Sequence, residues 1–370
     1  MQIFIILSLG VVITLISSKI FSLPPQRAIA LFIWHTFFSF IYAWYVSKFG
    51  GDAIYYYDEA QNGNYSFGTS TSFIVFISTF FYQLANLSFF SMGILFGIFG
   101  IIGLLAFDAS LRCVIKDAPK KIKLLATIIV FMPSVSFWSS GLGKDTIAFT
   151  AINLILWASL NLNKRKLILI FGIISLFLVR PHMAVLLLLA FSTVILMTKN
   201  LKFSIRIIYF FILVITTILI VPVALEITDF KQNLTLENVM DYLEDRQEYN
   251  WKDWDGGIDI SSMSPPIQIF TYLFRPLPFE AHNIFALLVS LENVFLMYLF
   301  VMGLFSKFNG RRVSVNPHLY SSFFWLYSIT ALILLSMTTA NFGISVRQKW
   351  MFLPFLIVLF IFYIAERKKK

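Results

Sequence analysis

The sequence predicts an all-α membrane protein, and three observations predict it: the composition, the low charge content and the recurrence of long apolar segments. Of the 370 residues, 58% are hydrophobic and 13% are charged, whereas soluble domains carry roughly 25% charged residues. The mean hydropathy is +0.81. A soluble domain cannot bury so much apolar surface, so soluble, disordered and collagen-like classes are excluded. The single cysteine, Cys113, excludes an intramolecular disulfide and a cysteine metal cluster.

Apolar segments of membrane-spanning length recur along the chain. A helix that crosses a hydrocarbon layer of about 30 Å needs roughly 20 apolar residues. We expect spans at residues 2–18, 28–47, 88–107, 123–138, 146–162, 167–179, 183–198, 203–225, 284–305, 319–338 and 351–365. Residues 72–81 are apolar but too few to cross alone, so they are either re-entrant or an extension of the third span. The sequence predicts one integral membrane domain, residues 1–370, with about eleven transmembrane helices.

The loops between these spans alternate between two charge classes. Lys and Arg dominate one class, whose acidic residues are Asp108, Asp117 and Glu366. Basic loops stay in the cytoplasm during insertion, so we expect the N-terminus outside and the C-terminus inside. The remaining loops are net acidic, and the net charge of +10 therefore indicates topology and not nucleic-acid binding. The first apolar run has no basic residue before it, which is typical of an anchor and not of a cleavable signal peptide.

The first outer loop, residues 48–70, combines carboxylates with three consecutive tyrosines. Its acidic residues are Asp52, Asp58 and Glu59. One interpretation is a solvated turn beside an interfacial belt of aromatic residues. The other is a general base held at the membrane surface near a helix end.

Residues 139–146, SSGLGKDT, join two apolar segments through a glycine-rich turn. The segment does not fit the Walker A motif, because Trp138 occupies the place of the first glycine and Asp145 follows the lysine. Two interpretations remain. The turn is either a hairpin capped by Asp145 or an anion site formed by Lys144 and a helix N-terminus.

Arg180 and His182 lie in a minimal turn, LVRPHM, between two apolar segments. Charged groups at this depth usually face a cavity or a partner. The guanidinium fork suits an oxyanion, and an imidazole can relay a proton. The alternative is an arginine at a helix end whose charged head reaches the water.

The only loop of domain-like length is the predicted large outer loop, residues 226–283. Its apolar residues Leu236, Val239, Met240 and Leu243 recur at helical spacing and predict an amphipathic helix on the membrane surface. We interpret the acidic residues of the opposite face as solvated. Two tryptophans that follow suit either a sugar-binding groove or an interfacial belt.

The end of this loop, FRPLPFEAHN, is the most informative stretch of the sequence. It places Arg275, Glu280 and His282 within eight positions, between prolines and ahead of a span. The interpretations are a rigid, ion-paired loop end or part of a site. Glu292 lies inside the next span, where a carboxylate is either a proton acceptor or the counter-ion of an outer arginine.

The unusual polar residues together predict an outer site for a diphosphate and a hydroxyl. We predict diphosphate-binding roles for Lys144, Arg180, Arg275, Arg347 and Lys349. We predict catalytic acids and bases among Asp52, Asp58, Glu59, His182, Glu280 and His282. The absence of H-E-x-x-H and G-x-S-x-G motifs argues against metalloproteases and serine hydrolases. We predict no cofactor, and the sequence leaves a divalent metal open.

Four segments together resemble one family. They are GGDAIYYY, FWSSGLGKDT, RPH and FRPLPFEAHN, and with the layout of spans they resemble the Wzy-like O-antigen and exopolysaccharide polymerases, polytopic GT-C-like glycosyltransferases of bacteria. The resemblance implies an enzyme of the bacterial inner membrane that joins undecaprenyl-diphosphate-linked oligosaccharides on the outer side without a nucleotide-sugar. It also implies membrane lipids and other polysaccharide-assembly proteins as partners.

The same resemblance implies residue roles. Arg180, Arg275 and Arg347 would hold the diphosphate leaving group, and Asp52 would activate the acceptor hydroxyl. His182, Glu280 and His282 are further candidates for that activation. The acidity of the large outer loop departs from the basic loops expected around a diphosphate.

Two other functions fit the same features. One is a transferase that adds a single sugar from a polyprenyl-phosphate donor. The other is a flippase or transporter of lipid-linked oligosaccharide. Transporters usually place ionisable groups near the membrane midplane on broken helices, whereas here most unusual residues are predicted on one side.

Overall fold

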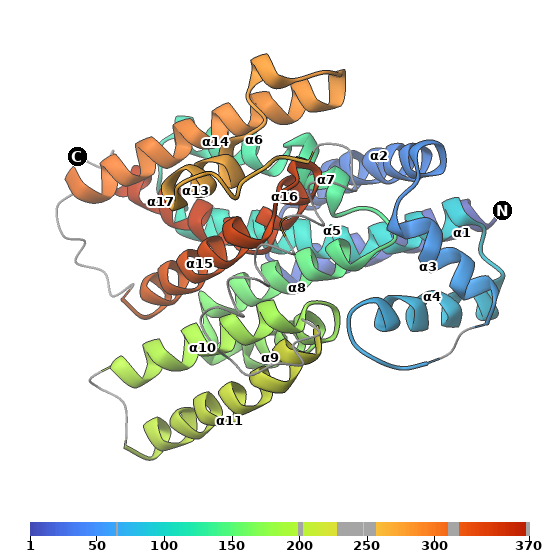
Figure 1. The fold of residues 1–370 in the computed structure, drawn as a ribbon. Coiled ribbons are helices and arrows are strands. Elements are labelled where there is room, and N and C mark those ends of the chain that lie inside the picture. The colour runs from blue at the N-terminus through green and yellow to red at the C-terminus, as the bar shows by residue number, and fades with distance from the viewer. Residues whose placement is uncertain (64–65, 199–202, 228–246, 248–256, 310–317, 368–370) are drawn as a thin grey trace. The chain divides into compact units, whose positions relative to one another are not determined.

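The computed structural model describes residues 1–63, 66–198, 203–227, 247, 257–309 and 318–367, and these residues form helices and short turns (Figure 1). The N-terminal helices are α1 (Gln2–Ile20), α2 (Pro25–Phe49), α3 (Asp52–Gln61), α4 (Thr71–Ala85), α5 (Phe89–Val114), α6 (Lys120–Val130), α7 (Pro133–Trp138), α8 (Lys144–Ser159) and α9 (Leu162–Val179). They are followed by α10 (Pro181–Met197), α11 (Phe203–Ile227), α13 (Pro265–Phe274), η1 (Pro278–Glu280), α14 (Ile284–Asn309), α15 (His318–Thr338), α16 (Phe342–Gln348), η2 (Lys349–Met351) and α17 (Leu353–Arg367). The described residues include no strand, only an isolated bridge between Gly257 and Asn341. The predicted all-α class is confirmed.

Several of these helices are long and apolar enough to cross a membrane. Five qualify within the described chain, namely α1, α2, α5, α14 and the Tyr320–Thr338 part of α15. A sixth span results if the pair Phe342–Met351 and Leu353–Glu366, bent by 63°, is counted as one. The helices α4 and α10 are apolar but shorter. The helices thus fit a membrane bundle, while the count of eleven spans and the orientation of the termini stay predictions.

The chain divides into two compact units, which we describe separately. Unit 1 comprises Met1–Pro181 with Ile364–Lys370, and unit 2 comprises His182–Tyr363.

The core of unit 1 is built on α5, which packs against α1, α2, α6 and α8. Glycines along α5 allow this close packing. A Cβ atom at Gly100 would lie 1.9 Å from the carbonyl oxygen of Ser139, and one at Gly97 would lie 2.4 Å from Oγ of Ser39. Helix α8 is buried from Thr146 to Ser159. A Cβ atom at Gly103 would lie 2.7 Å from Cα of Thr150, so this glycine lets the buried helices α5 and α8 pack closely at the centre of unit 1.

The predicted span 123–138 is wrong as a continuous helix. Helix α6 ends at Val130, and α7 begins at Pro133 after Met132 adopts an extended backbone with φ −60° and ψ 129°. Proline disfavours the α-helical conformation of the residue before it and cannot donate a backbone hydrogen bond. The break turns the chain toward the glycine-rich turn before α8.

The first outer loop, residues 48–70, contains a helix that we did not predict. Helix α3 begins at Asp52 after Gly50 and Gly51, whose positive φ angles of 83° and 149° favour glycine. Its buried residues Ala53, Tyr56 and Ala60 lie on one face, and α3 packs against α4.

Residues 72–81, predicted as re-entrant or as an extension of the third span, belong to a separate helix. Helix α4 ends at Ala85, and Asn86 follows it in the left-handed conformation, with φ 45° and ψ 50°. Asparagine tolerates this conformation better than most residues, so it stops the helix before α5 begins.

Unit 2 contains a compact group of helices around the end of the predicted large outer loop. Helix α13 packs against α14, α15 and α16, and the Tyr327 hydroxyl donates to the carbonyl of Met351 at 2.9 Å. Gly303 of α14 lies against the ring of Phe360 of α17. The predicted amphipathic helix at 236–243, in contrast, lies outside the described residues, as does most of the first half of the loop 226–283.

Candidate functional site

The turn Ser139–Gly143 is held in place by close contacts with α2 and α5. A Cβ atom at Gly141 would lie 2.0 Å from the Tyr42 ring, and the Ser139 carbonyl lies against Gly100. Only glycine fits at these two approaches, which explains Gly141 in SSGLGKD and Gly100 in α5. The turn fixes where α8 begins, and therefore where Lys144 and Asp145 lie.

An ion pair joins the start of α8 to the end of α9. Nη2 of Arg180 donates to Oδ1 of Asp145 at 2.6 Å, and the two side chains are 14% and 18% exposed. Arg180 precedes Pro181, which favours an extended residue, and it has φ −144° and ψ 71°. Its Nε atom is buried and makes no hydrogen bond among the described residues. One side of the guanidinium is therefore fixed by Asp145, while the buried Nε keeps its donor unused.

Lys144 belongs to the same cluster. Its ammonium donates to the Thr71 hydroxyl at 3.1 Å, and the backbone N–H of Ser70 donates to the carbonyl of Leu178 at 2.7 Å. These two contacts fasten the start of α4 to the start of α8 and the end of α9. We call Lys144, Asp145 and Arg180 the α8 cluster.

The charge of the α8 cluster favours an anion. Lys144 and Asp145 lie in the first turn of a 16-residue helix, and Arg180 is bonded to Asp145 there, where the N-terminal backbone N–H groups and the helix dipole add positive potential. The predicted cap by Asp145 is wrong, because Gly143 is the N-cap residue of α8 and no side chain caps the helix, whereas the anion site stays a prediction. Asp145 lies in the first turn of α8 and accepts from Arg180, and Lys144 adds a second positive charge there.

The three predicted carboxylates of the first outer loop lie on α3, in the same unit. Asp52 and Asp58 are exposed and Glu59 is half-buried. Tyr56 of α3 approaches within contact distance of the position of Gly143, since a Cβ there would lie 3.8 Å from its ring. Helix α3 therefore runs beside the turn that carries the α8 cluster.

A second polar cluster lies in unit 2, where Arg275 and Glu280 form an ion pair. Nε of Arg275 donates to Oε1 of Glu280 at 2.8 Å, and the N–H of Leu277 donates to Oε2 at 2.7 Å. The guanidinium carbon of Arg275 lies 5.1 Å from the centre of the Phe342 ring. Both carboxylate oxygens are engaged, so this geometry favours a Glu280 that holds Arg275 in place.

The electrostatics of Glu280 agree with that geometry. Burial raises the pKa of Glu280, but the hydrogen bonds from Arg275 and Leu277 and the charges of Arg275 and His282 outweigh it, so the pKa is lowered. A carboxylate that stays ionised and bonded in this way is a weak proton acceptor.

Lys349 does not lie on a surface. It is 1% exposed at the break between α16 and α17, and its ammonium donates to the side-chain oxygen of Asn293 and, at 3.5 Å, to the carbonyl of Leu273. Asn293 in turn donates to the carbonyl of Pro276 at 3.1 Å. Lys349 therefore links α14, the end of α13 and the bend, and Asn293 is a participant that the sequence did not indicate.

The remaining predicted residues of unit 2 are distributed over several elements. Arg347 is half-buried on α16, His182 is half-buried in the first turn of α10, and His282 is exposed before α14. Glu292 is half-buried on α14, next to Asn293. The structure thus pairs Arg180 with Asp145, the residue after Lys144, and, separately, Arg275 with Glu280.

Asp108 of unit 1 is a buried, ion-paired residue that we had assigned to a loop. Asp108 was predicted just beyond a span, but α5 continues to Val114 and the Asp108 side chain is 2% exposed inside it. It is paired with Arg27 and Arg112. The signal available in the sequence was an acid at the end of an apolar run with an arginine four residues later.

No metal site is apparent in the part of the chain that the structure describes. Within those residues, no group of three or more His, Cys, Asp or Glu side chains is placed to hold a metal ion.

The fold and its apolar helices define a multi-pass membrane protein of the all-α class. Comparison of the chain with models of protein families, with curated proteins and with solved structures gives no significant match.

Proposed function

We propose that the chain is a membrane glycosyltransferase that joins undecaprenyl-diphosphate-linked oligosaccharide units into a polymer on the outer side of the bacterial inner membrane. The α8 cluster is the observation that supports this proposal most. Lys144 begins α8, Arg180 is bonded to Asp145 in the same first turn, and a diphosphate is the kind of leaving group that cations at a helix N-terminus stabilise.

The reaction follows from the chemistry of such a donor. The acceptor sugar hydroxyl attacks the anomeric carbon of the donor, a new C–O glycosidic bond forms, and the bond from that carbon to the diphosphate oxygen breaks. Undecaprenyl diphosphate leaves with the bonding electron pair. Lys144 and Arg180 stabilise the charge that develops on it.

The proton of the attacking hydroxyl passes to a carboxylate. Asp52, Asp58 and Glu59 are the candidates in unit 1, because α3 lies beside the turn before α8. Among them, Asp52 begins α3 directly after two glycines with positive φ, and we assign it the role of general base.

The test is polymer formation by the purified full-length protein with undecaprenyl-diphosphate-linked oligosaccharide. We expect Arg180→Ala and Lys144→Ala to lower the rate about a hundredfold, the usual cost of losing a group that stabilises developing negative charge. Lys48→Ala is the matched control, since Lys48 is an exposed lysine at the end of α2. Parental rates in both site variants would contradict the assignment. Products extended by one sugar, without a ladder of lengths, would instead indicate a single-sugar transferase.

One observation favours transport of the same lipid as a second candidate function. Lys349 is a buried cation at the bend between α16 and α17, and transporters use broken helices of this kind for binding. Lys349→Met should then abolish translocation of lipid-linked oligosaccharide in liposomes. Translocation at the parental rate, or none by the parent, rejects this candidate.

A further inference from the structure

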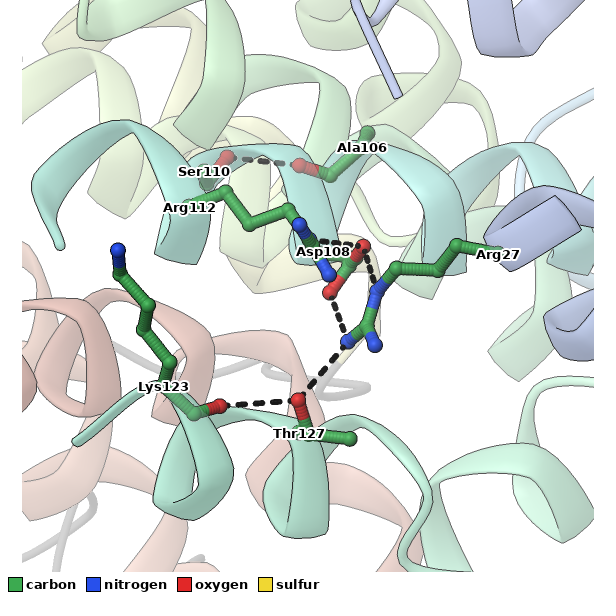
Figure 2. Close-up of polar contacts among 7 residues, drawn as sticks. All are labelled: Arg27, Ala106, Asp108, Ser110, Arg112, Lys123 and Thr127. Carbon is green, nitrogen blue, oxygen red and sulfur yellow. Dashed lines mark hydrogen bonds and ion pairs between the residues drawn. The ribbon is translucent and has the colours of Figure 1, made fainter. Parts of the chain in front are cut away.

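A second cationic group lies between α5 and α6, and the proposed glycosyl transfer does not use it. Its centre is the buried Asp108 carboxylate (Figure 2). Nε and Nη2 of Arg27 donate to the two carboxylate oxygens at 2.7 Å each, and Nε of Arg112 donates to Oδ2 at 3.0 Å. Such a two-pronged pair fixes both position and orientation of the guanidinium.

Arg27 also reaches α6. Its Nη2 donates to the Thr127 hydroxyl at 3.3 Å, and that hydroxyl donates to the carbonyl of Lys123 at 2.9 Å. The guanidinium carbon lies 5.8 Å from the centre of the Phe131 ring. These contacts tie α2, α5 and α6 together, and the Lys123 side chain extends from α6 in the direction of α5 (Figure 2).

The positive charge of this group exceeds its negative charge. The group contains three cations, Arg27, Arg112 and Lys123, and one carboxylate, Asp108, which the two arginines contact. Among the described residues, Nη1 of Arg27, both Nη atoms of Arg112 and the Lys123 ammonium make no hydrogen bond. The Arg112 side chain is 41% exposed, so these donors can reach a ligand. A group with unused, partly exposed N–H donors and surplus charge attracts an anion.

The surroundings specify what kind of anion fits. Helix α6 has 11 residues, about 16 Å in length, which is too short to cross a membrane. It leaves Leu124 61% exposed and Ile128 45% exposed, next to exposed Lys120 and Lys121 in its first turn. A ligand with a phosphate and an apolar tail would contact both the cations and these leucine and isoleucine side chains, whereas free phosphate would contact only the cations.

We propose that Arg27, Arg112 and Lys123 bind the headgroup phosphate of an anionic phospholipid, whose acyl chain lies against Leu124 and Ile128. Basic groups beside membrane helices are recognised sites for such lipids. The site is separate from the α8 cluster. Tyr42, which contacts the turn before α8, lies on α2 about 22 Å along the helix from Arg27 at 1.5 Å per residue.

The experiment titrates the purified full-length protein in detergent with phosphatidylglycerol and follows bound lipid by native mass spectrometry. Arg112→Gln with Lys123→Gln should weaken binding about tenfold, because two cations beside the phosphate are lost. The matched control is Lys164→Gln with Lys166→Gln, which removes two exposed lysines from the first turns of α9 and should leave the affinity unchanged. Equal losses in both variants, or no loss in the first, overturn the proposal.

Two further measurements distinguish a lipid phosphate from a soluble one and cover the case in which a variant misfolds. Glycerol phosphate that binds as tightly as phosphatidylglycerol would overturn the lipid assignment, as would equal affinity for phosphatidylcholine. Leu124→Ser with Ile128→Ser should weaken lipid binding and leave glycerol phosphate unaffected. If the double arginine–lysine variant fails to fold, Lys123→Gln alone decides, since its ammonium makes no contact among the described residues; about a fivefold loss is expected.

Discussion

Two aspartates of unit 1, Asp108 and Asp145, each pair with arginine but in different surroundings. Asp108 is 2% exposed and accepts from Arg27 and Arg112, whereas Asp145 is 18% exposed and accepts from Arg180. A carboxylate as deeply buried as that of Asp108 needs cationic partners for its charge, because an unpaired buried charge costs folding free energy. The pair at Asp145 is partly open, and its arginine keeps a buried donor without a partner. Both pairs join helices, and they differ in the burial of the carboxylate, which is closed to water at Asp108 and partly exposed at Asp145.

The largest expected effect comes from removing the buried carboxylate of Asp108. Asp108→Ala leaves Arg27 without its partner in a largely buried position, and we expect the free energy of unfolding to fall by roughly 3–5 kcal/mol. Asp145→Ala should lower it by about 1–2 kcal/mol, because water can reach the place of the 18% exposed Asp145 carboxylate and not that of the 2% exposed Asp108 carboxylate. Thermal and denaturant unfolding of both variants in detergent measures the difference. Equal losses would show that the two pairs are energetically alike and would refute the comparison.

A smaller effect is expected from disturbing the contact between Gly100 of α5 and the turn before α8, which positions the α8 cluster. Gly100→Ala would place a Cβ atom 1.9 Å from the Ser139 carbonyl oxygen, and such overpacking costs about 1–3 kcal/mol of stability. Gly93→Ala on the same helix is the control, because its Cβ would meet Ala43 at an ordinary 3.6 Å. Unfolding should distinguish the two variants, and polymer formation should fall only in Gly100→Ala. A tolerated Gly100→Ala would show that the turn is not held by α5.

The smallest effect extends the comparison to the ion pair of unit 2. The pKa of Glu280 is lowered from its ordinary 4.5, so the Arg275–Glu280 pair stabilises the fold above that pH and loses its contribution as the pH falls through the lowered value. Stability measured between about pH 5 and pH 3 should therefore fall less steeply in Glu280→Gln than in the parent. Because other carboxylates titrate there too, the difference between the two curves is the measurement. Parallel curves would contradict a paired Glu280.

The sequence predicted elements whose signals are local and missed those that depend on neighbours. Long apolar runs gave α1, α2, α5 and α14, because a membrane-spanning helix needs only length and apolarity. The break before Pro133 was available from the sequence, since proline ends a helix, yet the apolar run was taken as one span. Helix α3 was not expected, because its three tyrosines and three acids resemble an interfacial loop until Tyr56 packs against the start of α8.

The same contrast between local signals and contacts with distant neighbours holds for the candidate site. Lys144, Arg180, Arg275 and Glu280 were selected as unusual charges in apolar surroundings, and their roles stay predictions, but charge alone does not reveal pairing. The partner of Arg180, Asp145, was interpreted as a cap, and Lys349 was expected on the outer surface although it is buried against Asn293. Pairing is a property of side chains far apart in sequence, which only packing brings within hydrogen-bonding distance.

The sequence by itself determined that this chain is a helical membrane protein, because apolar content and segment length are sums over residues and need no neighbours. It also determined which charges stand out. The tertiary structure alone decided that Asp108 is buried and paired with two arginines, and that the ion pair of the α8 cluster is partly exposed. It also decided that Gly100 and Gly141 let the turn before α8 pack closely against α5 and α2. The physical reason is that the free energy of a charge depends on burial and partners, and both are set by contacts between distant segments.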